Sequence, residues 1–107
     1  MAALEETLVL IKPDGVARNL TGEILRRIEV KGYALVDLRM VQADRDLLAA
    51  HYAEHAGKPF FEPLIAFMQS GPIVAARVAG NDVIAGFRSL AGATNPTIAA
   101  PGTIRGD

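Results

Sequence analysis

The stretch Thr7–Gly15 reads T-L-V-L-I-K-P-D-G and joins a strand-like apolar run to a charged residue. Four consecutive apolar residues, Leu8 to Ile11, predict a short strand buried on both faces, and the following Pro-Asp-Gly predicts a turn. Lys12 stands at the end of this strand. Because a buried ammonium group is costly without an anionic partner, Lys12 is expected either to extend to solvent or to face an anionic ligand.

The next two segments predict a helix and a second strand. Thr21 suits the N-cap of a helix over 22–31, and Gly32 suits its C′ position; the apolar stripe of this helix is Ile24, Leu25 and Ile28. Residues 33–41 alternate in polarity, which predicts a half-buried strand whose inner face carries Ala34, Val36, Leu38 and Met40. The chain therefore begins β-α-β.

The remaining segments predict two more helices, a central strand and a last helix. Asp44 suits the N-cap of a helix that runs to about Ala56, and Pro63 suits the first turn of the next helix. Pro72 precedes a strand over 73–78. Asn81 is then predicted to cap a helix with the apolar stripe Val83, Phe87 and Leu90.

The predicted order β-α-β-α-α-β-α resembles an α+β, ferredoxin-like split β-α-β sandwich, in which helices cover an antiparallel sheet. That plan needs a fourth strand after the last helix. Residues 92–107 instead contain Gly, Pro, Asn and Thr without a sustained period, which predicts a loop. A loop of this length is usually either functional or disordered.

Composition sets the broad class of protein. The 107 residues are 50% hydrophobic and 21% charged, which predicts one domain over residues 1–107 with a single core. The absence of cysteine excludes disulfides, iron–sulfur clusters and cysteine zinc sites. A net charge of -1 argues against nonspecific binding to nucleic acid or to an anionic membrane. With no signal-peptide pattern and no apolar run near the roughly 20 residues of a membrane span, we expect a cytoplasmic protein.

Two histidines in H-Y-A-E-H match the H-x-x-E-H pattern of inverted zinc peptidases. On a continuous helix, His51 and His55 would share one face beside a candidate general base. The pattern is short, and a third protein ligand would be required. Surface or packing histidines are the favoured interpretation, with a zinc peptidase as a remote alternative.

Cations and hydroxyls stand at or near the predicted ends of elements, as phosphate recognition requires: Lys12, Arg88, Thr94, Thr103 and Arg105. Arginine offers a bidentate fork, lysine a point charge, and Gly-rich turns offer backbone N–H groups. Each of these residues alone is better read as a solvated group. Neither G-x-x-x-x-G-K-[ST] nor G-x-G-x-x-G occurs, so a phosphate site here would be neither a P-loop nor a Rossmann turn.

Aromatic residues surround the turn of the predicted helical hairpin. A slot for a flat ring would be formed by Tyr52, Phe60, Phe61 and Leu64. Apolar residues at this spacing more often belong to the core, so both interpretations stay open.

Five motifs extend along the whole chain in order: L-V-L-I-K-P-D-G-V, H-Y-A-E-H-A-G-K-P-F-F, M-Q-S-G-P-I-V-A, G-A-T-N-P and A-P-G-T-I-R-G-D. In these motifs the sequence resembles nucleoside diphosphate kinase. The resemblance implies a ferredoxin-like subunit of a homo-oligomer. It also implies transfer of the γ-phosphate of a nucleoside triphosphate to a nucleoside diphosphate through a phosphohistidine, with Mg²⁺ carried on the nucleotide.

The resemblance also implies roles for individual residues. Contacts to the phosphates of ATP, ADP, GTP, GDP and related nucleotides are implied for Lys12, Tyr52, Arg88, Thr94 and Arg105. Phe60, together with Leu64, would lie against the base. Because stacking reads no base edge, purine and pyrimidine nucleotides should both be accepted. No metal ligand is implied for His51 or His55.

The family's nucleophilic histidine belongs to an N-x-x-H-G-S-D segment that would follow Arg105-Gly106-Asp107. We therefore expect the chain to be C-terminally incomplete, without the nucleophile and the fourth strand, and residues 1–107 alone to be inactive. No catalytic residue is assigned, because His51 and His55 fall elsewhere in the motifs. The favoured interpretation is a phosphotransferase represented by part of its chain; the alternative is a catalytically inactive nucleotide-binding or assembly module.

Overall fold

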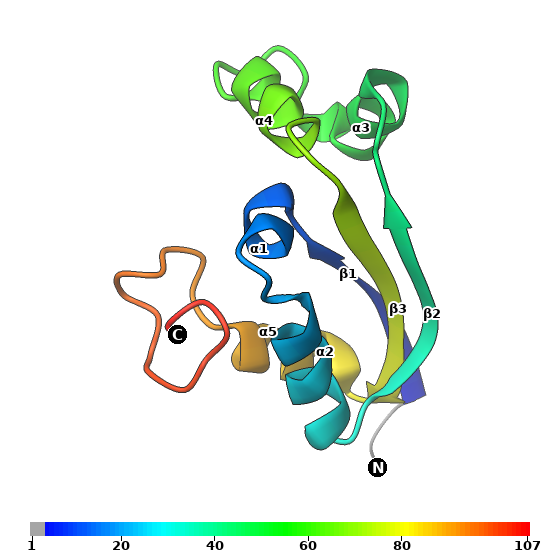
Figure 1. Ribbon diagram of the computed structural model, residues 1–107, viewed down its shortest axis with the longest axis vertical. Helices are drawn as coiled ribbons and strands as arrows, with labels where there is room; N and C mark the ends of the chain where they lie inside the picture. Colours follow the sequence, from blue (N-terminus) through cyan, green and yellow to red (C-terminus); the bar gives the residue numbers. More distant parts are fainter. Residues whose placement is uncertain (1–3) are drawn as a thin grey trace. The chain divides into compact units, whose positions relative to one another are not determined.

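The computed structural model of the protein describes residues 4–107. Its elements follow one another in the order β1 (Leu4–Ile11), α1 (Pro13–Ala17), α2 (Thr21–Val30), β2 (Ala34–Val41), α3 (Arg45–His51), the 3₁₀ turn η1 (Ala53–His55), α4 (Phe61–Met68), β3 (Ile73–Asn81) and α5 (Val83–Ala91) (Figure 1). The strands form a sheet of order β1-β3-β2. With β3 antiparallel between the two other strands, the fold is α+β and ferredoxin-like, which confirms the predicted class.

The predicted turn after β1 is instead the short helix α1. Pro13 occupies its first position, where the missing N–H costs nothing, and the Lys12 carbonyl accepts a hydrogen bond from the Val16 N–H at 3.1 Å. The other predicted elements are present in the predicted order.

The described chain divides into two compact units. The first unit contains residues 4–9, Gly22–Asp37 and Ala76–Asp107, and the second contains Leu10–Thr21 and Leu38–Ala75. Each unit has its own hydrophobic cluster. The assignment of one domain to residues 1–107 stays a prediction.

The core of the first unit lies between strand residues and the helices α2 and α5. Its buried members are Val9, Ile28, Ala76, Val78 and Val83. The predicted stripes of both helices pack here, because Ile24, Leu25, Phe87 and Leu90 contact this cluster. At the end of α2, Gly32 has a φ of 102°, as the predicted C′ position requires.

The predicted burial of β1 and β2 is wrong. Exposure alternates along β1, and Leu8 is 56% exposed, so this strand is not buried on both faces. On β2 the alternating apolar set from Ala34 to Met40 is exposed, with Met40 at 62%, whereas Leu35 and Val41 pack against the cores. The position of the covering helices decides which face of a strand is inside, and the hydropathy of β2 does not report that position.

The second unit is built around the hairpin of α3 and α4. The Asp44 side chain accepts a hydrogen bond from the Leu47 N–H at 2.8 Å, which confirms the predicted N-cap of α3. Pro63 lies in the first turn of α4, as predicted. The predicted end of α3 at Ala56 is wrong, because α3 ends at His51 and η1 follows.

The start of α5 also differs from the prediction. Asn81 is the last residue of β3, and Asp82 takes the cap position with a φ of 53° and no side-chain cap hydrogen bond. Beyond α5, residues 92–107 contain turns and no helix or strand, as predicted. Within residues 4–107, no helix is both long enough and apolar enough to cross a membrane.

Tyr33 packs against two glycines of the first unit. A Cβ on Gly80 would lie 2.6 Å from the Tyr33 Cδ1, and a Cβ on Gly86 would overlap the Tyr33 hydroxyl. We expect Gly86→Ala to destabilise the protein by about 1–3 kcal/mol, because the ring must move out of a packed site. Chemical denaturation measures this change.

The matched control is Gly22→Ala in α2, where an added Cβ meets no atom within 4 Å. This variant should gain about 0.5–1 kcal/mol from reduced backbone entropy. Tyr33→Phe removes the nearest clashing atom and should recover part of the Gly86→Ala loss. A Gly86→Ala protein as stable as the parent would contradict the packing of Tyr33.

Candidate functional site

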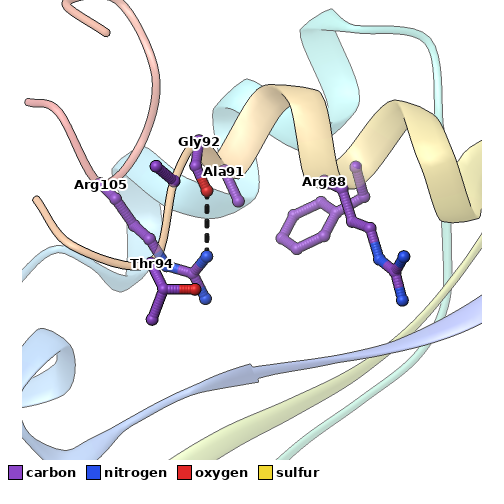
Figure 2. A pocket seen from close by; sticks show the side chains of 7 residues that line it. Arg88, Ala91, Gly92, Thr94 and Arg105 are labelled. Atoms are coloured by element: carbon purple, nitrogen blue, oxygen red, sulfur yellow. Dashed lines mark hydrogen bonds between the residues drawn. The ribbon is translucent and has the colours of Figure 1, made fainter. Parts of the chain in front are cut away.

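A pocket of about 390 Å³ lies at the C-terminal end of α5 in the first unit. It is lined by Phe87, Arg88, Ala91, Gly92, Ala93, Thr94 and Arg105. Figure 2 shows Arg88 projecting from α5 on one side, with Thr94 and Arg105 close together on the other. Three of the predicted phosphate-binding residues are thus brought to one pocket, although Arg105 comes from a different turn of the chain.

Backbone hydrogen bonds hold the C-terminal segment against the end of α5. The Ile104 N–H donates to the Leu90 carbonyl at 2.9 Å, and the Arg105 N–H donates to the Ala91 carbonyl at 2.8 Å. These carbonyls lack partners within the helix, so the contacts complete the hydrogen bonding of its last turn. They also fix the point from which the Arg105 side chain begins.

The Arg105 guanidinium lies at the negative end of the α5 dipole. Its Nη1 donates to the Gly92 carbonyl at 3.0 Å (Figure 2). A guanidinium has five N–H donors, so this bond leaves others able to meet an anion. Arg105 therefore closes the helix end and contributes positive charge to the pocket at the same time.

Gly92 makes the close approach of the C-terminal segment possible. Its φ is 86°, and a Cβ there would lie 2.5 Å from the Thr103 Oγ1. Thr103 itself lies outside the pocket lining: its Oγ1 donates to the Ala100 carbonyl at 2.6 Å and accepts from the Gly106 N–H at 3.0 Å. Thr103 was one of the candidate phosphate-binding hydroxyls, but its hydroxyl instead stabilises the turn between Ala100 and Gly106.

Lys12 lies in the second unit, at the junction of β1 and α1. Its side chain is exposed. The sequence left open whether this ammonium extends to solvent or faces an anionic ligand, and the exposed position is compatible with both.

The predicted aromatic slot separates into core and surface residues of the second unit. Tyr52, Phe61 and Leu64 are partly buried against the core, and burial raises the pKa of the Tyr52 hydroxyl. Phe60 is 48% exposed, with the Lys58 Nζ 5.9 Å from its ring centroid. Tyr52, Phe61 and Leu64 thus pack against the core and keep part of their surface exposed, while Phe60 keeps a ring surface available for stacking.

The two histidines do not share a helix face. Since α3 ends at His51, His55 lies in η1, where its ring stacks on Tyr52 with centroids 6.2 Å apart and meets Phe60 edge-on at 5.2 Å. No group of three or more metal-ligating side chains occurs in residues 4–107. His55 is a packing residue here, in agreement with the favoured interpretation of the histidines.

The sequence did not identify several residues that form the pocket at the end of α5 and the surroundings of Phe60. Phe87 and Ala91 line the pocket because α5 turns them toward it, and their apolar character predicted only core packing. His55 and Lys58 flank Phe60. Composition predicted the loop that carries Thr94, but only the motif G-A-T-N-P tied this loop to a nucleotide site.

Comparison with known proteins covers almost the whole chain. A relative from Thermobifida fusca, named nucleoside diphosphate kinase, is 57% identical over 104 residues, which are 97% of this chain and 77% of the relative. A relative of the same name from Mycobacterium avium is 62% identical over 104 residues, covering 96% and 76%. A solved structure of a halophilic nucleoside diphosphate kinase from Halobacterium salinarum, in complex with CDP, matches with a TM-score of 0.95 at 48% identity and covers 98% of this chain and 69% of that one.

Fold and pocket define a ferredoxin-like α+β protein with a cationic site at a helix end. A family model described as nucleoside diphosphate kinase matches residues 5–107. The chain belongs to the nucleoside diphosphate kinase family, whose members are enzymes that transfer phosphate between nucleotides. Neither the zinc peptidase nor the inactive module receives support from these matches.

Ionised carboxylates should make the fold sensitive to acid. The pKa of Glu23 falls to about 2 because of hydrogen bonds from Arg26 and Arg27, and Arg45 lowers the pKa of Glu62. For Asp107 the Gly102 N–H and then Arg27 lower the pKa. A depressed carboxyl pKa stabilises the fold above the unfolded-state value of about 4, and this contribution is lost as the pH falls through the folded-state value.

We therefore expect the melting temperature to decrease when the pH is lowered below about 4. Calorimetry at several pH values measures this decrease. Asp107→Asn should show a shallower loss between neutral and acid pH than the parent. Equal melting temperatures at neutral pH and at about pH 3 would contradict the ionised pairs.

Proposed function

We propose that the α5 pocket binds the phosphates of nucleoside di- and triphosphates such as ADP, ATP, GDP and GTP. The observation that carries this proposal is the convergence of Arg88, Thr94 and Arg105 on one pocket. Two guanidinium groups and a hydroxyl offer charge-assisted and neutral hydrogen bonds of the kind that phosphate oxygens accept. The CDP complex of the Halobacterium salinarum relative supports a nucleotide as the ligand.

We propose further phosphate contacts from Lys12 and Tyr52, nearest the transferred group. The exposed ammonium of Lys12 can pair with an anion without prior burial. The Tyr52 hydroxyl can donate a hydrogen bond to a phosphate oxygen, and burial raises its pKa further above the ordinary value. Both assignments rest on the resemblance of L-V-L-I-K-P-D-G-V and H-Y-A-E-H to the family motifs.

Phe60, with Leu64 beside it on α4, is proposed to contact the base. The half-exposed ring supports this role, because a core phenylalanine would have no free face. Stacking is sequence-tolerant, since every base has a π-face. The site should therefore accept several nucleotides with similar affinity.

The proposed reaction is transfer of a γ-phosphate through a phosphohistidine. An imidazole nitrogen attacks the γ-phosphorus, the bond to the β–γ bridging oxygen breaks, and the nucleoside diphosphate leaves. A terminal oxygen of a second nucleoside diphosphate then attacks the phosphohistidine and restores the imidazole. Neither His51 nor His55 is proposed as this nucleophile, because His55 packs between aromatic rings and both lie outside the family's N-x-x-H-G-S-D motif.

Mg²⁺ is proposed to arrive with the nucleotide. The pocket is lined by cations, a hydroxyl and apolar groups, and residues 4–107 contain no cluster of metal-ligating side chains. These residues fit a metal held by phosphate oxygens, where it would offset negative charge.

We propose that the protein is a cytoplasmic homo-oligomer. Exposed apolar side chains on the strands support self-association, since large exposed apolar groups often mark interfaces: Leu4, Leu8, Val36, Leu38 and Met40. The absence of cysteine suits a reducing compartment.

Arg88→Ala should weaken ADP binding by about 1.5–3 kcal/mol, the value of a charge-assisted contact. Calorimetric titration of ADP measures the change. The control is Arg77→Ala, an exposed arginine of β3 that pairs with Glu6 and does not line the pocket. Equal ADP affinities for Arg88→Ala and the parent would contradict the phosphate site.

Phe60→Ala should weaken binding of ADP, GDP and CDP by a similar amount, about 1–3 kcal/mol for one stacked base. Titrations with each nucleotide test this expectation. Phe67→Ala, on the partly exposed side of α4, serves as a control for general loss of packing. A large melting loss without a change in nucleotide affinity would instead assign Phe60 to the core.

A further inference from the structure

Arg27 links α2 to the C-terminal segment of the first unit. Its Nη2 donates to the Asp107 Oδ2 at 2.8 Å across 80 residues of sequence. Its Nε donates to the Glu23 Oε1 at 3.0 Å, and the Arg27 side chain is only 22% exposed. The planar fork of one guanidinium thus binds a carboxylate of its own helix and one of the distant segment.

Asp107 in turn closes the last turn of the segment. Its Oδ1 accepts a hydrogen bond from the Gly102 N–H at 2.9 Å, and its own N–H donates to the Thr103 carbonyl at 3.0 Å. This turn is tight at Gly106, because a Cβ there would overlap the Ala100 carbonyl and lie 2.8 Å from the Thr103 Oγ1. A displacement of Asp107 would therefore be transmitted through the turn.

Arg105 lies inside this closed turn. On one side its backbone N–H is bonded to α5 through the Ala91 carbonyl, and on the other side Asp107 is bonded to Arg27. The Arg105 guanidinium extends from between these two anchors to the Gly92 carbonyl in the pocket. The first anchor holds the Arg105 backbone directly, and the second acts two residues further along the chain.

We infer that Arg27 is a positioning residue for phosphate binding, acting through Asp107 on Arg105. This inference rests on the proposed phosphate role of Arg105. Without the Arg27–Asp107 pair the segment samples other conformations, and the apparent affinity for a nucleotide falls in proportion to the competent fraction. The Arg27–Asp107 pair, although Arg27 does not line the pocket, would then affect the affinity of the pocket for a nucleotide.

Arg26 provides an internal comparison. Its Nε and Nη2 donate to the two Glu23 oxygens at 3.0 and 2.9 Å, so it shares a partner with Arg27. Within residues 4–107, the side-chain hydrogen bonds of Arg26 stay within α2. A helix-stabilising effect would be common to both arginines, whereas positioning of Arg105 belongs to Arg27 alone.

The test measures ADP affinity by calorimetry in the intact protein for Arg27→Met, Asp107→Asn and the control Arg26→Met. Asp107→Asn keeps an oxygen for the Gly102 N–H and removes the charge that pairs with Arg27. We expect Arg27→Met and Asp107→Asn to weaken ADP binding on the order of tenfold, and Arg26→Met by less than about twofold. Melting curves of each variant fix a temperature at which all are folded.

The same substitutions in an Arg105→Met background give a double-mutant cycle. If Arg27 acts through Arg105, Arg27→Met should add little further loss there. Additive losses, or equal affinities for Arg27→Met and Arg26→Met, would overturn the positioning role. An Arg105→Met protein that binds ADP as tightly as the parent would overturn the proposed phosphate site itself, and this inference with it.

Discussion

The docking of residues 104 and 105 on the last carbonyls of α5 is the contact on which the functional site depends. The Ile104 and Arg105 N–H groups meet the Leu90 and Ala91 carbonyls at 2.9 and 2.8 Å. Hydrogen bonds within residues 95–107 close the local turns of this segment, and the two bonds to Leu90 and Ala91 attach it to α5. Because Arg105 is one of the docked residues, the same contact that satisfies the helix end also brings a guanidinium to the pocket.

Local patterns predicted most of the fold, because the apolar stripe and the caps of a helix depend on residues that are close together in the sequence. The stripes of α2 and α5 and the Asp44 cap were all predicted, and each depends on spacings of at most seven residues. Three errors were local: the turn after β1 is α1, α3 ends earlier, and the cap of α5 is Asp82. The error in strand burial arose where distant partners decide which face is covered. The apolar set of β2 was assigned to the core, but the core instead takes Leu35 and Val41, and no local signal on β2 reports this choice.

The site could be predicted from the sequence only in part. Residue chemistry singled out Arg88, Thr94 and Arg105 as able to hold phosphate, yet their spacing gave no reason for them to meet. The motifs of the nucleoside diphosphate kinase family supplied that reason. The Arg27–Asp107 pair was beyond both approaches, since contact between residues 80 positions apart leaves no periodic trace. For Phe60 the sequence left two roles open, core and stacking surface. Only the structure distinguishes it, by its exposure, from neighbours of similar hydropathy.

The central claim is that the pocket at the end of α5 binds nucleotide phosphate. A crystal structure of the protein with ADP and Mg²⁺ tests it most directly. The account predicts phosphate oxygens within hydrogen-bonding distance of the Arg88 and Arg105 guanidinium groups and the Thr94 hydroxyl, with Arg105 still bonded to the Gly92 carbonyl. Phosphate density elsewhere, with this pocket holding only solvent, would contradict the account.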